Sequence, residues 1–395
     1  MEIITTTEGL KGLCQDFARE SFVTVDTEFM REQTFWPVLC LIQIAGAERQ
    51  AIIDPLAENI SLKAFFELMA NRKVVKVFHA ARQDLEIIWL KAKLIPQPLF
   101  DTQIAAMVCG FGDQVGYEAL ARRIAKTQID KSSRFTDWNR RPLSQKQLAY
   151  ALSDVTHLRV IYQKLRDILD LSGREPWLEE EMAVLTSPAT YETHPEEAWR
   201  RVKFRPRSRK QLAVLMAVSA WREREAQERN VPRSRVLKDD AIAEIATQAP
   251  TDQPTLKSLR ALPRGYAGSR IGEAILKAIA TGVALDPQDL PKLDDQKVSL
   301  TERASVIAEV LKLALKVVCD REGIAPRIVA GASDLEAIAL DDAADVPLLK
   351  GWRRSVFGET ALKIKAGEMA IVLHNGKPRL MPFYGDAVPE MKAAE

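Results

Sequence analysis

The chain has 395 residues, a formal net charge of +2, 28% charged residues and 47% hydrophobic residues. These values exclude a fibrous or wholly disordered chain, and the length predicts two or three domains with their own cores. No window approaches the ~20 apolar residues of a membrane span, and the N-terminus lacks a secretion signal. We therefore expect a cytoplasmic protein without a membrane partner. The four cysteines lie far apart and without a C-x-x-C motif, which predicts reduced thiols rather than a zinc site or a disulfide scaffold.

The small net charge hides a strong segregation of charge along the chain. Residues 171–199 hold one basic and seven acidic residues, whereas residues 200–270 hold 17 basic and seven acidic residues. The densest run, residues 200–210, has seven basic residues and no acidic one. Such a run is typical of a phosphate-binding surface, and a solvated linker is the alternative.

The first 170 residues alternate between two kinds of hydrophobic pattern. Short apolar and β-branched runs predict strands over 22–25, 38–44, 51–53 and 74–78. Helical periodicity predicts helices over about 61–70, 84–93, 102–109 and 145–166. Strands interleaved with helices indicate an α/β domain, and the short connection over 45–50 predicts an antiparallel hairpin within a mixed sheet.

The strand pattern disappears after residue 208. Ser208 is a predicted N-cap of a helix that must end before Pro232, and a capping box is expected over 333–336. Other predicted helices cover about 239–247, 269–280 and 301–322. The expected organisation is a domain over 1–170, a linker over 171–207, all-helical modules over 208–286 and 297–372, and a tail over 373–395.

Three groups of acidic residues carry the chemical signal. Asp26 and Glu28 stand two positions apart at the end of a predicted strand, so their side chains face the same way. Asp84 stands near the start of a helix, where a plain N-cap is the alternative. Tyr150 and Asp154 lie one helical turn apart and can address one site, and a buried tyrosine beside an exposed acid is the alternative.

The order Asp-x-Glu, Asp, Tyr-x-x-x-Asp resembles the Tyr variant of the DEDD superfamily of 3′–5′ exonucleases, and the flanking residues narrow the resemblance to the ribonuclease D family. The supporting motifs are Asp26-Thr27-Glu28-Phe29, Val77-Phe78-His79-Ala80 and Asp137-Trp138-x-Arg140-Arg141-Pro142-Leu143. Ala220-Trp221-Arg222-Glu223 and Pro232-x-x-x-Val236-Leu237-x-Asp239 resemble the HRDC helical domain. Residues 297–370 resemble a more divergent second HRDC-like module, with Gly351-Trp352-Arg353-Arg354 as the best local match.

This resemblance implies an α/β catalytic domain of the ribonuclease H-like, DnaQ-like type, with a mixed sheet flanked by helices and followed by two small all-α HRDC-like domains. It implies a metal-dependent exoribonuclease that releases 5′-mononucleotides from RNA 3′ ends and matures precursor tRNA and other small structured RNAs. Tyr150 would position the attacking water. The residues that would hold two divalent metal ions, Mg²⁺ or Mn²⁺, are Asp26, Glu28, Asp84 and Asp154.

Two other functions stay open at this point. A DNA 3′–5′ exonuclease would use the same chemistry, because only contacts to the 2′-OH separate RNA from DNA. A non-catalytic RNA-binding scaffold is the second alternative, although the complete set of acids argues against it. The sequence does not reveal whether the protein binds another protein or which oligomeric state it adopts.

Four further residues are candidate substrate contacts. Phe35 and Trp36 could stack on terminal bases, and packing in the core is an equal alternative. Arg141 could contact the RNA, with a surface arginine beside a packed tryptophan as the alternative. His79 could line the site or serve only as a structural residue of the turn before the helix that carries Asp84.

Overall fold

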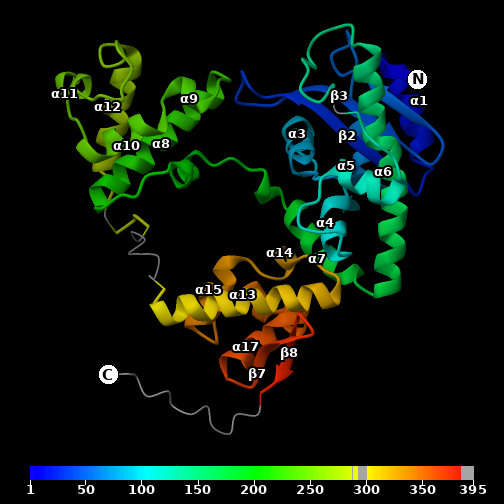
Figure 1. Cartoon of the computed structure of the whole chain (residues 1–395). Coiled ribbons are helices and arrows are strands. Elements are labelled where there is room, and N and C mark those ends of the chain that lie inside the picture. The colour runs from blue at the N-terminus through cyan, green and yellow to red at the C-terminus, as the bar shows by residue number, and fades with distance from the viewer. Residues whose placement is uncertain (131, 287, 292–299, 384–395) are drawn as a thin grey trace, which may run out of the picture.

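The computed structural model describes residues 1–130, 132–286, 288–291 and 300–383. Figure 1 shows three parts, namely an N-terminal α/β domain, a first helical module with α8 to α12, and a second helical module with α13 to α17 and a terminal hairpin. The predicted fold class, an α/β domain followed by helical modules, is confirmed.

A six-stranded mixed sheet lies at the centre of the N-terminal domain, in the order β1-β4-β3-β2-β5-β6. Its strands are β1 (Glu2–Ile4), β2 (Phe22–Met30), β3 (Val38–Ala45), β4 (Gln50–Ile53), β5 (Val75–Phe78) and β6 (Leu99–Asp101). Within this sheet β3 runs antiparallel to both neighbours, and the other strand pairs are parallel. The β3–β4 pair is the predicted antiparallel hairpin.

Helices cover the sheet through their apolar residues. They are α1 (Thr7–Phe17), α2 (Lys63–Ala70), α3 (Arg82–Ala92), α4 (Thr102–Val108), α5 (Tyr117–Leu120) and α6 (Gln145–Ser172). Ser144 and Gln147 form a capping box that fixes the start of α6. The first half of α6 then packs Ala151 and Val155 against β3 and β4. This packing holds the beginning of α6 on the sheet, beside β2.

The connector, residues 171–207, is acidic and then basic, and it differs from the linker that the charge pattern predicts. After α6, helix α7 (Glu175–Leu185) packs Leu178 and Met182 into the core of the N-terminal domain. Further along, Val202 belongs to the core of the first helical module. The connector therefore folds against both neighbours, because its apolar residues outweigh the charge pattern that suggested a solvated segment.

The first helical module is built around a close pair of helices. Its helices are α8 (Arg209–Glu228), α9 (Arg233–Val236), α10 (Asp239–Gln248), α11 (Gln253–Lys257) and α12 (Arg270–Val283). Ser208 caps α8 as predicted, since its hydroxyl accepts a hydrogen bond from the Gln211 N–H. Gly282 allows α12 to approach α8, because a Cβ there would lie 2.7 Å from the Ala213 carbonyl oxygen.

The second helical module contains helices and one hairpin. Its elements are α13 (Glu302–Glu322), α14 (Pro326–Val329), α15 (Ala332–Leu340), α16 (Gly351–Arg353), α17 (Glu359–Lys365), β7 (Met369–His374) and β8 (Lys377–Pro382). The cap of α15 lies at Gly331, two residues before the predicted Ser333, and Asp334 accepts its N–H.

The hairpin corrects both the all-helical prediction for this module and its boundary at residue 372. Asn375 and Gly376 adopt φ of 50° and 73°, the left-handed values that a two-residue turn between strands requires. The described part of the predicted tail is therefore strand and turn up to Pro382. Residues 384–395 of that tail and residues 297–299 of the predicted module lie outside the described residues.

The second helical module shares a continuous apolar core with the N-terminal domain. Trp177 of α7 stacks on Trp352, with ring centroids 4.5 Å apart and planes 10° apart. Arg174 donates a hydrogen bond of 2.6 Å to the Glu322 carbonyl oxygen. These contacts from the connector fix the module against the α/β domain.

Two expectations from composition can be compared with the fold. No helix in the part of the chain that the structure describes is both long and apolar enough to cross a membrane. All four cysteines are free, and Cys14, Cys40 and Cys319 are buried. Burial raises the pKa of the Cys14 thiol to about 12, so this thiol stays protonated at neutral pH.

Candidate active site

Strand β2 carries Asp26 and Glu28 within its length, not at its end as predicted. The strand continues to Met30, and its pairing with β3 shifts register directly after Glu28. The pairing of β2 with β5 ends at Thr24 and Val77. Beyond this point β2 and β5 separate, and the acidic residues of β2 line a cavity there.

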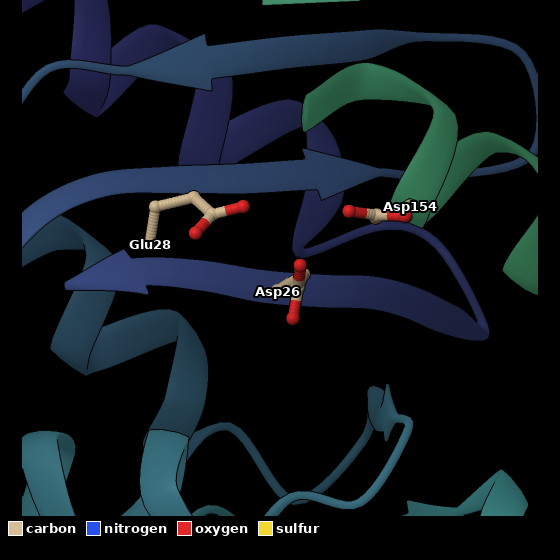
Figure 2. A group of neighbouring side chains, drawn as sticks. All are labelled: Asp26, Glu28 and Asp154. Carbon is tan, nitrogen blue, oxygen red and sulfur yellow. The ribbon is translucent and has the colours of Figure 1, made fainter. Parts of the chain in front are cut away.

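Asp26, Glu28 and Asp154 converge on one point (Figure 2). Each offers one carboxylate oxygen, and these atoms lie within 4.8 Å of one another. Figure 2 shows the Glu28 and Asp154 carboxylates directed toward Asp26 from opposite sides. Because all donors are oxygens, the cluster suits a hard divalent cation such as Mg²⁺ and suits zinc poorly.

Burial of these three acids in one cavity raises their pKa values. Desolvation is the largest cause, and the pKa reaches about 6 for Asp26, about 8 for Asp154 and about 9 for Glu28. Repulsion from Asp26 adds to the shifts of the other two. The cluster therefore resists full ionisation on its own, and a bound cation would offset the repulsion.

Asp84 lies beside the cluster in the first turn of α3, and it is not the N-cap of that helix. The N-cap is Ala81, whose N–H donates to Asp101 at 2.8 Å. Asp84 is buried and accepts a hydrogen bond from the Thr27 hydroxyl. Burial, followed by repulsion from Asp26, raises the pKa of Asp84. The middle residue of the Asp-Thr-Glu motif thus orients the fourth acid of the site.

Two tyrosines flank Asp154. The Tyr150 side chain forms a hydrogen bond with Asp154 that lowers the pKa of this acid, but burial raises the same pKa by more. Burial and the surrounding carboxylates raise the pKa of Tyr150, so its phenol stays protonated. Tyr117, which the sequence did not suggest, donates a hydrogen bond of 2.7 Å to the Ser153 carbonyl oxygen. This bond ties α5 to α6 next to Asp154.

The acids line a cavity of about 650 Å³, within the usual size range of small-ligand sites. His79 lies in its wall with Nδ1 3.0 Å from the Thr102 hydroxyl oxygen, and burial lowers its pKa. Arg134 and Phe135 also line the cavity, although the sequence did not single them out. Phe135 is 91% exposed, and the Arg134 guanidinium lies 5.1 Å from its ring centre. The sequence contains one indication of this wall, because Arg134-Phe135 is a basic–aromatic pair in the segment before the helix with Tyr150.

Phe35 and Trp36, the residues expected to stack on bases, do not line this cavity. Phe35 is only 5% exposed and packs against Ala226 and Val236 of the first helical module. The backbone N–H groups of Phe35 and Trp36 donate to the Asn230 side-chain oxygen at 3.1 and 3.0 Å. Core packing, the alternative for this pair, is observed for Phe35, whereas Trp36 is only partly buried against the same cluster, and the cluster joins two domains.

Arg141, another expected substrate contact, makes its hydrogen bonds within the protein. Its guanidinium forms two hydrogen bonds of 2.7 Å to Asp54 and another of 2.7 Å to the Cys40 carbonyl oxygen. A further bond of 2.8 Å reaches the Trp138 carbonyl oxygen. Most of its donors are therefore used within the protein, in an arrangement that fixes the loop before α6 to β3 and β4.

Comparison with known proteins agrees with this site. Residues 1–170 match the family model described as 3′–5′ exonuclease, and residues 211–279 match the HRDC domain. The chain is 51% identical over 377 residues to ribonuclease D of Nitrobacter hamburgensis, with coverage of 95% of this chain and 98% of the relative. It is 47% identical over 369 residues to ribonuclease D of Granulibacter bethesdensis, with coverage of 93% of each chain.

Among solved structures, the chain is similar to Escherichia coli RNase D, described as an exoribonuclease involved in structured RNA processing. The TM-score is 0.79 at 27% sequence identity, and the match covers 92% of this chain and 98% of that chain. A protein from Bifidobacterium adolescentis, with a TM-score of 0.62 and 21% identity, shares the fold.

The mixed sheet, the carboxylate cluster and the matched models define a 3′–5′ exonuclease domain joined to an HRDC domain. The chain belongs to the ribonuclease D family. It is a hydrolase, a 3′–5′ exoribonuclease that acts on nucleic acid. Its cluster of carboxylates indicates dependence on a divalent metal.

Proposed function

We propose that this chain removes 5′-mononucleotides from RNA 3′ ends by two-metal-ion hydrolysis, in the maturation of precursor tRNA and other small structured RNAs. The observation that carries the proposal is the convergence of three partly buried carboxylates from β2 and α6 within 4.8 Å. The proposed ligands of two Mg²⁺ or Mn²⁺ ions are Asp26, Glu28, Asp84 and Asp154.

The four acids have different proposed roles. When bound, the two cations supply a hydroxide-like water at neutral pH and neutralise the developing charge on the leaving 3′ oxygen. Asp26 lies between Glu28 and Asp154, so its carboxylate is the proposed shared ligand. Glu28 and Asp154 would complete the ligand set on the side of the attacking water. Asp84, oriented by Thr27, supports the second position.

Tyr150 is the proposed water-positioning residue. Its raised pKa keeps the hydroxyl protonated, so the group orients a water by hydrogen bonding and does not remove a proton from it. His79 is a proposed substrate contact because it lines the same cavity as the acids.

RNA is the proposed substrate because the relatives that match 95% and 93% of this chain are named ribonuclease D. The description of the Escherichia coli structure as an enzyme of structured RNA processing supports small structured RNAs, including precursor tRNA. A DNA exonuclease would need the same phosphate chemistry without a contact to the 2′-OH. A scaffold without activity would have no use for four acids in one cavity, because their partial burial and mutual repulsion are unfavourable.

We further propose that residues 1–170 form the catalytic domain and that both helical modules help to hold the RNA. The first module lies in the segment with 17 basic and seven acidic residues. The second module, extended to Pro382 by the hairpin, is the proposed divergent HRDC-like domain. A structural match over 92% of the chain supports this organisation.

Product analysis on matched RNA and DNA oligonucleotides tests the proposed activity. With Mg²⁺, we expect 5′-mononucleotides to appear in order from the RNA 3′ end. Faster cleavage of the DNA would favour the DNA exonuclease, and no product from either polymer would favour the scaffold. Spectroscopic titration with Mn²⁺ tests the metal count, for which we expect two ions per chain and fewer in Asp26→Asn.

A further inference from the structure

A second polar cavity lies where the N-terminal domain, the connector and the first helical module meet. It has a volume of about 230 Å³, and four arginines line it, namely Arg31, Arg82, Arg201 and Arg233. Sites for drug-sized ligands begin at about 300 Å³, so this cavity is too small for a whole nucleotide. A phosphate group is a better match in size and charge.

Two glutamates hold three of these arginines in place. Arg31 forms paired hydrogen bonds of 2.8 and 2.7 Å to Glu86. Glu223, which is fully buried, accepts from Arg233 at 2.6 Å and from Arg201 at 3.3 Å. Each guanidinium has five N–H donors, so these bonds leave donors available for an anion. The acids thus orient the arginines without using up their donors.

Arg82 differs from the other three because it has no acidic partner in the part of the chain that the structure describes. Its side chain is exposed, at the start of α3. The four arginines outnumber the three glutamates at the cavity, Glu86, Glu192 and Glu223, by one positive charge. Glu192 pairs with His194, and Arg201 and Arg233 share Glu223. An anion that enters the cavity would supply the missing partner.

The arginine cavity lies next to the carboxylate cavity. Arg82 and Glu86 line the first, whereas Gln83 and Asp84 of the same helical turn line the second. The end of β2 shows the same division, since Phe29 of the strand lines the carboxylate cavity and Arg31, the residue directly after the strand, lines the arginine cavity. A strand whose 3′ end lies at the carboxylates would pass the arginines on its way to the first helical module.

We propose that the arginine cavity binds a backbone phosphate of single-stranded RNA upstream of the scissile bond. The proposal rests on the proposed function, because it requires the RNA 3′ end to lie at the carboxylates. Arg82 is the main residue of the proposed site, because it has no acidic partner among the described residues, and the other three arginines complete the site. The site would hold any RNA sequence, since phosphates carry no base information.

The test measures binding as a function of RNA length. Single-stranded RNAs of 2 to 12 nucleotides are titrated by fluorescence anisotropy in the Asp154→Asn background, at several salt concentrations. We expect Arg82→Gln to weaken binding of the 12-mer by about tenfold more than binding of the dinucleotide. The slope of log affinity against log salt should fall by about 0.7 for the lost phosphate contact. Arg82→Lys should recover most of the affinity, because it restores the charge.

Arg19→Gln is the matched control, because Arg19 is exposed just after α1 and lines neither cavity. An equal loss at every length would place Arg82 at the carboxylates, and no loss at any length would remove it from the substrate path. Either result overturns the proposal. Hydrolysis of the dinucleotide by the native chain tests the proposed function separately, so failure of that activity is distinguishable from failure of the arginine cavity. Unchanged thermal midpoints check that the variants fold.

Discussion

Asn230→Ala should loosen the contact between the catalytic domain and the first helical module. The Asn230 side-chain oxygen accepts hydrogen bonds from the N–H groups of Phe35 and Trp36 at 3.1 and 3.0 Å. A net contribution of about 0.5–1.5 kcal/mol per bond gives a loss of roughly 1–2 kcal/mol, because the Trp36 N–H can bond to water instead. The opening equilibrium of this contact should therefore rise by about 5- to 30-fold.

Hydrogen exchange of the segment with Phe35 and Trp36 measures this opening. Asn59→Ala is the matched control, because Asn59 also has a positive φ, 60° against 48° for Asn230, and lies exposed on the surface. We expect faster exchange of this segment in Asn230→Ala and native exchange in Asn59→Ala. Equal exchange in both variants would show that the two hydrogen bonds do not hold the domains together.

Three further results follow from the site. Tyr150→Phe should lower kcat by roughly 10²- to 10⁴-fold with little change in RNA affinity, and steady-state kinetics that show an unchanged kcat would remove the hydroxyl from the mechanism. The metal-free protein should become less stable between pH 5 and pH 8, because the folded pKa values of Asp26 (about 6), Asp154 (about 8) and Glu28 (about 9) exceed those of the unfolded chain. The folded state then holds more protons than the unfolded state, so the thermal midpoint measured in EDTA should fall as the pH rises. Mg²⁺ should raise the midpoint more at pH 8 than at pH 5. Arg141→Gln should lower the thermal midpoint and leave the RNA affinity unchanged, because the Arg141 guanidinium forms its hydrogen bonds within the protein. A selective loss of RNA affinity would instead show that Arg141 contacts the substrate.

The sequence predicted most of the candidate site because the chemistry depends on local spacing. Asp26 and Glu28 share a strand face through the two-residue period, and Tyr150 and Asp154 share a helix face through the four-residue spacing. The orientation of Asp84 was not predictable in this way. It depends on the Thr27 hydroxyl, which lies 57 positions away in sequence and reaches Asp84 only after β2 and β5 have paired.

The contacts that Phe35 and Arg141 make within the protein were not predictable from the sequence, for a shared physical reason. Aromatic and basic residues near an acidic motif suit nucleic acid, and they suit a domain interface equally well. Phe35 meets Asn230 across 195 positions, and Arg141 meets Asp54 across 87 positions. Sequence spacing contains no information about such distant partners.

The terminal hairpin is a different case, because its signal was present in the sequence. Asn375-Gly376 follows the apolar run 369–373, and this dipeptide is typical of a two-residue hairpin turn. The strands flank this turn in register, with His374 opposite Lys377. The helical pattern of the residues before these strands concealed the change from a helical to a strand-like hydrophobic period.

The central claim is that the carboxylate cluster on β2 and α6 holds the metal ions that hydrolyse RNA 3′ ends. The most direct measurement follows the release of 5′-mononucleotides from a 3′-labelled RNA by the native chain and by Asp26→Asn, with Mg²⁺ and with EDTA. We expect release only by the native chain with Mg²⁺, while RNA binding by Asp26→Asn stays close to native. Near-normal turnover by Asp26→Asn, or full activity of the native chain in EDTA, would contradict the account.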